Sequence, residues 1–224
     1  FSKLDRWALR WLRLHSADVC PIETDKNLGL ALVSRGWVNS QLAIHVRSDV
    51  ATPLTAPQAA DLIGDITGAL SLYVDNALRA RAILPGNARY LLANVHTHKH
   101  PRLRINVKVH KHPFESRPIV NTRGSMLQPL AKFLNVALAD LQQSCPHVIL
   151  SSKQLVRNLA SFGSLETAFT LVTFDISSLF PSLCCIANDD PLSVFAVLSP
   201  LIRTHFRDSH SLGTFIINGL YLLL

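Results

Sequence analysis

The chain has 224 residues, of which 48% are hydrophobic and 17% charged, a composition that favours a globular protein and excludes a disordered one. No uncharged apolar run is long enough to span a membrane, so no membrane partner is expected. The net charge is +7, and segment 96–132 alone holds eight Lys or Arg residues against one acid. This excess indicates a polyanionic partner, although a merely solvated basic surface would give the same count.

The first 95 residues are expected to form a helical N-terminal region. Apolar residues recur at helical spacing over 4–12, with basic residues between them, which predicts an amphipathic helix. Its tryptophans, Trp7 and Trp11, are expected in the core rather than on a ligand.

A polar turn and a long helix come next in the chain. Residues 24–29 predict the turn, and residues 28–33 a short buried strand. Lys26 could touch a phosphate or be a plain turn lysine. Thr55 is expected to cap a long helix that ends at Pro85-Gly86-Asn87.

The most regular pattern is an alternation of apolar and polar residues over 103–110. This period of two predicts a strand with one apolar face. Residues 112–116 form a turn in this interpretation, and residues 117–120 return as an edge or ribbon strand, because Pro118 cannot donate a ladder hydrogen bond. The sequence therefore predicts a projecting β-hairpin that gathers three cations: Lys108, Lys111 and Arg117.

Helices are expected over most of the remaining chain. Leucines at helical spacing predict a helix over about 129–142, and Ser151 or Ser152 could cap a short helix. Asp190 and the proline after it predict the start of a helix that runs to about Ile202. The remaining C-terminal residues are apolar and are expected to be helical.

The stretch 171–180 holds one acid, Asp175, inside a run of apolar, β-prone residues. We expect a buried strand over 171–176 that delivers this carboxylate to its end. A buried carboxylate is costly unless a metal, a cation or a donor compensates it, so a metal site is one interpretation. An aspartate that caps the following turn is the other.

Four parts of the chain, in this order, resemble the reverse transcriptases, specifically the retroelement type related to Penelope-like elements. Residues 24–29 resemble the upstream Asp-Lys segment of that family, and residues 107–111 with 117–120 resemble its fingers motifs. Residues 128–134 are similar to the helix that follows the fingers motifs. Residues 174–181 are similar to the palm motif that carries the first catalytic acid.

The resemblance implies an α+β fold of the right-hand polymerase type. In this prediction residues 1–95 are a helical region that leads into the fingers. Residues 96–224 are the fingers hairpin and a partial, truncated palm. The chain begins with Phe1 and ends with three leucines, so we expect it to be a fragment.

The resemblance also implies a reaction, transfer of a nucleotide from a dNTP to a primer 3′ hydroxyl on an RNA or DNA template. The family uses two Mg²⁺ ions for this. Asp175 is then the catalytic, metal-binding acid, and Ile176 supplies a backbone carbonyl to the metal. Phe180 falls where the family has a sugar-selecting ring, although it could be an ordinary core phenylalanine.

The hairpin cations acquire roles by the same resemblance. Lys108 and Arg117 are expected to bind the nucleotide by neutralising its triphosphate, for which the Arg fork is well suited. Lys111 is a third candidate. The protein would be intracellular, with the nucleus as one fitting compartment, and its four cysteines lack the spacing of a disulfide framework.

The chain also departs from the family. Asp189-Asp190 lies too close to Asp175 to be the second acidic motif and is interpreted as a helix cap. The template-gripping segment of the family is absent, and Cys184-Cys185 replaces a more usual Asn-Ile, so the parent element could be decayed. We therefore expect this fragment to lack at least one catalytic acid and to be inactive alone.

Three alternatives stay open. The chain could be a non-catalytic nucleic-acid-binding remnant or a domesticated polymerase domain. It could be a helical interaction protein, which predicts no strand over 171–176. A zinc site is the third alternative, formed by alternating histidines. The histidines concerned are His96, His98, His100, His110 and His112.

Overall fold

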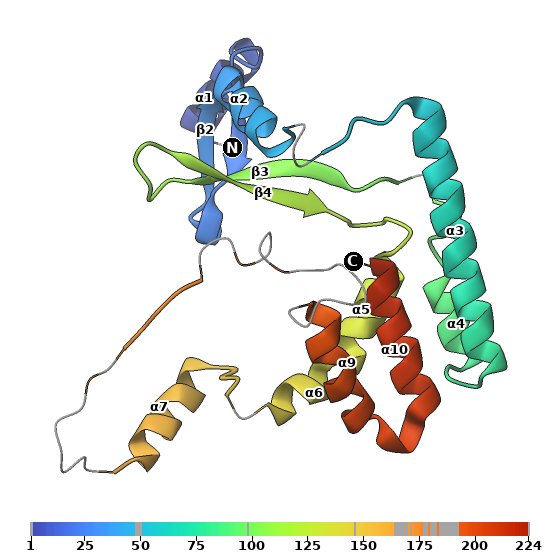
Figure 1. Ribbon diagram of the computed structural model, residues 1–224. Coiled ribbons are helices and arrows are strands. Elements are labelled where there is room, and N and C mark those ends of the chain that lie inside the picture. The colour runs from blue at the N-terminus through green and yellow to red at the C-terminus, as the bar shows by residue number, and fades with distance from the viewer. Residues whose placement is uncertain are drawn as a thin grey trace. The chain divides into compact units, whose positions relative to one another are not determined.

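The structure is a computed structural model. It is a mixed α+β protein, mostly helical, with two small two-stranded antiparallel sheets (Figure 1). The expected α+β class is confirmed at this level. The described residues are 2–47, 51–97, 99–145, 147–163, 170, 172–176, 179, 183 and 193–223.

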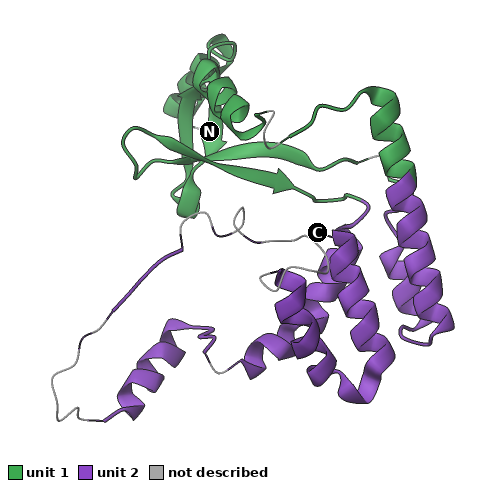
Figure 2. Cartoon of the chain, in the orientation of Figure 1, with its two compact units in different colours: residues 1–64, 97–125 green, residues 65–96, 126–224 purple. Residues whose placement is uncertain are grey.

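The chain forms two compact units, and each is built from two separate stretches (Figure 2). Unit 1 consists of Phe1–Gly64 and Thr97–Ser125, and unit 2 of Asp65–His96 and Met126–Leu224. Both sheets belong to unit 1. Its elements are α1 (Lys3–Leu14), β1 (Val19–Glu23), the 3₁₀ turn η1 (Asp25–Asn27), β2 (Leu30–Ser34), α2 (Arg35–His45), β3 (Arg102–Lys108) and β4 (Glu115–Asn121).

Helix α1 confirms the amphipathic pattern but not its expected burial. Ser2 and Asp5 exchange side-chain hydrogen bonds with each other's backbone N–H and cap the helix start. None of the helix residues is buried, and Trp7 is 64% exposed. The expectation of core tryptophans is therefore wrong. Periodicity shows that a helix has an apolar stripe, but it does not show that another element covers the stripe.

The polar turn between β1 and β2 also forms as expected. The Thr24 N–H and hydroxyl both donate to the Gly29 carbonyl, at 3.0 and 2.9 Å. Lys26 and Asn27 adopt left-handed backbone angles, φ 61° and 56°, which are strained for residues with a Cβ. Strand β2 follows, but its residues are exposed or half-buried, so its expected burial is wrong.

The predicted hairpin is β3 paired antiparallel with β4. Ile105 and Val107 are buried on one face, as the alternation requires. Helix α2 is held to this hairpin through the buried Ser116. The Ser116 hydroxyl donates to Gln41 Oε1 and contacts His45 Nε2, both at 2.8 Å.

Unit 2 is helical in its described part and has the larger apolar core. Helix α10 packs along α9 and α5, as Figure 1 shows. The most deeply buried side chains are Leu70, Val74, Leu91, Leu130, Leu134, Ile202 and Ile216. The helices are α3 (Ala56–Arg79, which starts in unit 1), α4 (Pro85–Leu91), α5 (Gln128–Ala137), α6 (Ala139–Ser144), α7 (Ser152–Ser161), α9 (Val194–His205), the 3₁₀ turn η2 (Arg207–Ser209) and α10 (His210–Leu223). None of the described helices is long and apolar enough to cross a bilayer.

The starts of two helices, α3 and α7, agree with the prediction. Thr55 and Gln58 exchange hydrogen bonds at the start of α3, and Ser151 caps α7. The expected stop at Pro85 is wrong, because this proline opens α4, where its missing N–H has no intrahelical role. Helix α9 is capped by Ser193 instead of the expected Asp190, which lies outside the described residues.

Over the described residues 172–176, the expected buried strand does not form. Residues 172–176 have no regular secondary structure and all five are exposed, with Phe174 at 89%. A strand needs a neighbour to accept its backbone hydrogen bonds, and both sheets of the described chain lie in unit 1. Residue 171 lies outside the described residues.

Candidate functional site

The β3–β4 register brings Lys108 and Arg117 to one face of the hairpin. Lys108 lies opposite Glu115, and Arg117 lies opposite Asn106, two residues along the same ladder. Side chains directly opposite each other point to the same face, as do residues two apart on a strand. The two expected phosphate-binding cations are therefore neighbours across the hairpin.

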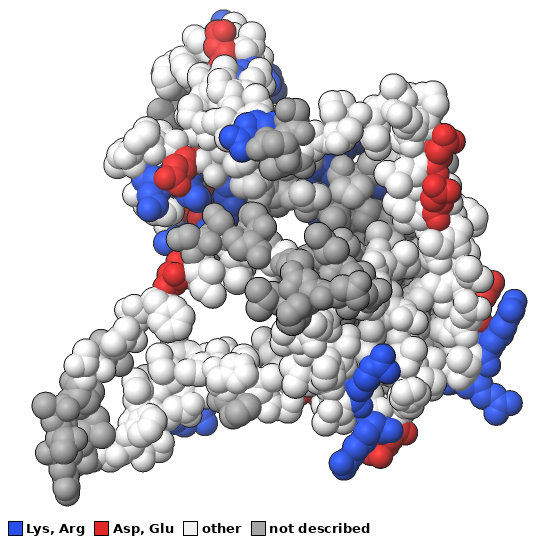
Figure 3. Space-filling model, viewed as in Figure 1, with Lys and Arg blue, Asp and Glu red and all other residues white. Residues whose placement is uncertain are grey.

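Three strand cations on this face, Arg104, Lys108 and Arg117, have a carboxylate partner. Arg104 contacts Glu23 at 2.7 Å, and Lys108 contacts Glu115 at 3.0 Å. In Figure 3, acidic and basic side chains accordingly lie beside one another near the hairpin tip. Both pairs are solvent-accessible, and such pairs stabilise a fold by no more than about 1 kcal/mol. The free energy lost when a phosphate group displaces these carboxylates is therefore small.

Lys111 lies in the hairpin turn and is exposed. Its backbone N–H donates to the Lys108 carbonyl at 3.1 Å. The hydrogen bond and charge of Lys108, with smaller contributions from the charges of Lys111 and His110, lower the pKa of Glu115 below its ordinary value of 4.5. The hairpin tip is thus locally electropositive.

The third carboxylate, Asp25, differs from the others because it is buried. Its side chain is 7% exposed, and Oδ1 contacts the Arg117 guanidinium at 3.3 Å. Its other oxygen, Oδ2, is buried and has no hydrogen-bond partner among the described residues. Sequence reasoning did not select Asp25, because an acid in a polar turn is expected to face solvent. Its place in a segment that resembles the upstream Asp-Lys motif was the available signal.

The expected catalytic acid lies in the other unit. Asp175 belongs to unit 2, is exposed, and accepts a hydrogen bond on Oδ1 from the Ile176 N–H at 2.9 Å. This contact with the next backbone N–H is closer to the turn-capping interpretation. Ile176 is also exposed, and Phe180 lies outside the described residues.

The alternating histidines do not form a metal site in the part of the chain that the structure describes. Within that part no three His, Cys, Asp or Glu side chains lie close enough together to hold a metal ion. His98 lies outside the described residues. The zinc interpretation therefore has no support from the other histidines.

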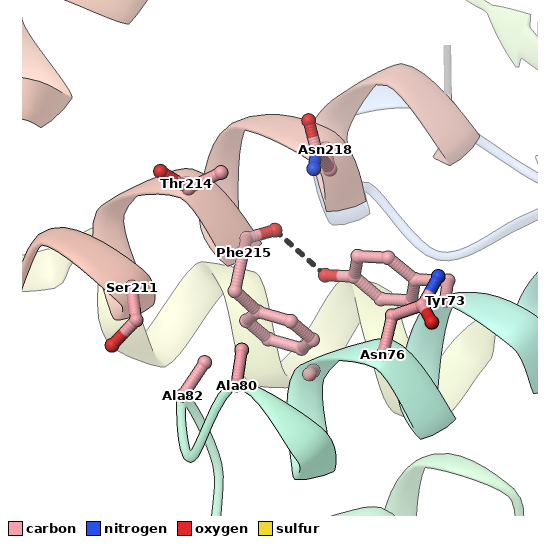
Figure 4. Close-up of a pocket in the computed structure, with 9 residues that line it drawn as sticks. Tyr73, Asn76, Ala80, Ala82, Ser211, Thr214, Phe215 and Asn218 are labelled. Atoms are coloured by element: carbon pink, nitrogen blue, oxygen red, sulfur yellow. Dashed lines mark hydrogen bonds between the residues drawn. The ribbon is translucent and has the colours of Figure 1, made fainter.

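A cavity of about 180 Å³ lies between α3 and α10 within unit 2 (Figure 4). The Tyr73 hydroxyl donates to the Phe215 carbonyl at 2.8 Å, and burial raises the pKa of Tyr73. The other polar groups of the lining are amides and hydroxyls. Because the lining carries no carboxylate, imidazole or cation, the cavity offers no acid–base pair. The lining residues are Tyr73, Asn76, Ala77, Ala80, Ala82, Ser211, Thr214, Phe215 and Asn218.

No protein-family model, curated protein or solved structure matches this chain. Any function assigned to the chain therefore rests on its own motifs and on the hairpin geometry.

Proposed function

We propose that the chain is part of an RNA-directed DNA polymerase, with the fingers hairpin and the beginning of the palm of a right-hand fold, and that it is inactive alone. The observation that carries this proposal is the common face of Lys108 and Arg117 on the β3–β4 hairpin. The family motifs assign these two positions to the triphosphate, and the hairpin forms from the same residues. Segment 96–132 supplies the positive charge that a template-primer requires.

The two cations suit different parts of a triphosphate. The Lys108 ammonium is a compact charge that exchanges partners readily, and Glu115, its present partner, is accessible to solvent. The Arg117 guanidinium presents a planar fork that matches two phosphate oxygens. Together they would neutralise the incoming nucleotide before the primer attacks.

The metal part of the proposal depends on Asp175 and Ile176. An exposed carboxylate with one oxygen beyond its contact to the next N–H is a hard donor that fits Mg²⁺. Bound Mg²⁺ would supply charge stabilisation for the attacking and leaving oxygens. One carboxylate does not complete a two-metal site, which is why inactivity of this chain alone is part of the proposal.

The first test is calorimetric titration of the 224-residue chain with a Mg²⁺–dNTP complex. Lys108→Ala and Arg117→Ala should each weaken binding by about tenfold, since each removes a charge-assisted contact. The control is Lys153→Ala, which removes one charge from an exposed position of α7. Equal affinity in all four proteins would refute the nucleotide site.

The second test concerns the acid. Asp175→Asn should abolish the part of dNTP affinity that depends on Mg²⁺ and leave the affinity without metal unchanged. Primer extension by the 224-residue chain should be undetectable. Extension comparable to that of a polymerase would show that the chain needs no further acid.

Two observations favour a second candidate, a helical interaction protein. Residues 172–176 do not form a strand, and the apolar stripe of α1 is exposed. This candidate predicts no affinity for nucleotides or nucleic acid. A non-catalytic nucleic-acid-binding remnant instead predicts salt-sensitive binding of single strands without dNTP binding.

A further inference from the structure

Asp25 is a buried acid at the edge of a basic hairpin face. The backbone of its neighbour Thr24 pairs with Val107 of β3, so η1 lies along β3. Strand β4 occupies the opposite edge of β3. To contact Asp25, the side chain of Arg117 must therefore reach from β4 across β3.

The turn that carries Asp25 is fixed by its own hydrogen bonds. Thr24 donates twice to the Gly29 carbonyl, and the left-handed angles of Lys26 and Asn27 lie between these two residues. Backbone strain of this kind persists only where the surrounding contacts hold it. The backbone of this turn therefore fixes where the Asp25 side chain begins.

The pairing with Arg117 is close to obligatory for Asp25. A buried carboxylate needs compensation, and its Oδ2 atom has no hydrogen-bond partner among the described residues. Arg117 is the cation that contacts Oδ1. Because separation would leave a buried charge uncompensated, the guanidinium is held where the turn places the carboxylate.

The rest of the guanidinium is available to a ligand. A guanidinium has five N–H donors, and the contact with Asp25 is made through one terminal nitrogen. The Arg117 side chain is 53% exposed, and no other described residue hydrogen-bonds to it. The Arg117 side chain leaves β4 on the hairpin face that Lys108 shares.

We propose that Asp25 is a positioning residue that holds the Arg117 guanidinium ready for the polyphosphate of a nucleotide. This inference rests on the proposed function of the hairpin. Asp25 thus differs in role from Glu23 and Glu115, which are accessible and compete with phosphate for their cations. Removal of the Asp25 charge should weaken anion binding, although it makes the face more positive.

The test is whether the loss of this negative charge weakens anion binding or strengthens it. The 224-residue chain is titrated with inorganic triphosphate, and Asp25→Asn is compared with Glu23→Gln. Both variants remove one negative charge from the hairpin region. Simple electrostatics predicts tighter binding for both. A positioning role predicts about three- to tenfold weaker binding for Asp25→Asn, and equal or tighter binding for Glu23→Gln.

A conservative variant and a double variant complete the design. Asp25→Glu keeps the charge but moves the carboxylate, and it should recover part of the affinity that Asp25→Asn loses. In an Arg117→Ala background, Asp25→Asn should cause no further loss, since its effect passes through Arg117. This comparison also decides the matter if Asp25→Asn alone unfolds, because without Arg117 the neutral side chain is the better tolerated one.

The two proposals fail differently. If wild type does not bind triphosphate, or if Lys108→Ala and Arg117→Ala bind as wild type does, the nucleotide site and the role of Asp25 are both overturned. If those two variants weaken binding while Asp25→Asn binds as tightly as Glu23→Gln, only the role of Asp25 is overturned. A further loss on Asp25→Asn in the Arg117→Ala background also overturns it.

Discussion

Among the described residues, three carboxylates pair with hairpin cations, and they differ mainly in burial. Glu23 and Glu115 are about half exposed, whereas the Asp25 side chain is 7% exposed. The distances to their cations span only 2.7 to 3.3 Å. Burial, and not separation, therefore decides which pair contributes to stability, because water screens the exposed pairs and cannot replace a partner for the buried one.

Arg117→Ala should destabilise the chain by about 1–3 kcal/mol, since it leaves a buried carboxylate without its cation. The matched control is Arg104→Ala, which breaks an exposed pair and should change stability by less than about 1 kcal/mol. Urea unfolding followed by circular dichroism measures both values. Equal losses for the two variants would show that Asp25 is not compensated by Arg117.

The pKa of Glu115 gives a pH-dependent signature at the hairpin tip. Since Lys108 lowers this pKa in the folded chain, the pair stabilises the fold above the ordinary carboxyl range, and that stabilisation is lost as pH falls below 4.5. Lys108→Gln should shift the Glu115 titration upward toward 4.5. Carbon NMR of the side-chain carboxyl measures the shift, and an unchanged titration would contradict the pairing.

At the scale of elements, local patterns predicted what local interactions decide. Alternation over 103–110 and Pro118 predicted the β3–β4 hairpin, and therefore the common face of Lys108 and Arg117. Serine and threonine caps predicted the starts of α3 and α7. These features depend on neighbours in sequence, so the sequence carries them directly.

Features that depend on distant partners were not predictable in this way. A β-prone run such as 171–176 requires a neighbouring strand, and the described part of unit 2 offers none. The burial of Asp25 depends on β3, which lies far along the chain. Trp7 belongs to an apolar stripe of α1 that no other described element buries, and the helical period alone did not reveal this.

Helix α10 lies close to its neighbours at Gly219. A Cβ there would lie 2.5 Å from the Tyr73 hydroxyl and 3.1 Å from Leu134. Gly219→Ala should therefore destabilise unit 2 by about 1–3 kcal/mol through overpacking. Gly68→Ala in α3 meets open space and should stabilise by about 0.5–1 kcal/mol. Thermal unfolding of both variants tests the helix contact, and a stabilising Gly219→Ala would contradict it.

The exposure of α1 gives a separate test. Trp7→Ala should change the free energy of unfolding by less than about 0.5 kcal/mol, because its side chain is largely in solvent. Leu134→Ala, at a 2% exposed core position of α5, should cost about 2–5 kcal/mol. Urea unfolding compares them. A large loss on Trp7→Ala would show that α1 packs onto the fold.

At the scale of the whole molecule, acids from the beginning of the chain partly neutralise the basic segment. Segment 96–132 is strongly basic by count, but Arg104 and Arg117 pair with Glu23 and Asp25 from the beginning of the chain. The hairpin is therefore less positive than its own sequence suggests. Cations outside these pairs, such as Lys111 in the turn, should dominate long-range attraction of a polyanion.

This charge pattern predicts a salt dependence. Binding of a single-stranded oligonucleotide should weaken with salt, and Lys111→Gln should reduce the slope of log K against log salt by about 0.7. Lys153→Gln, on α7 of unit 2, should leave the slope unchanged. Fluorescence anisotropy at several salt concentrations measures both. Identical slopes in the two variants would place the nucleic acid away from the hairpin tip.

The discontinuous make-up of unit 1 has a consequence for synthesis on the ribosome. The hydrogen-bond partner of Gln41 and His45 is Ser116, which follows them by 75 and 71 residues. The cation that pairs with Asp25 is Arg117, which is also translated much later. The nascent stretch 2–47 therefore emerges before the partners of its acid and of its polar side chains exist. It can fold completely only after the hairpin is translated. A ribosome stalled before residue 115 should hold this stretch in a protease-sensitive state, and release past residue 125 should protect it.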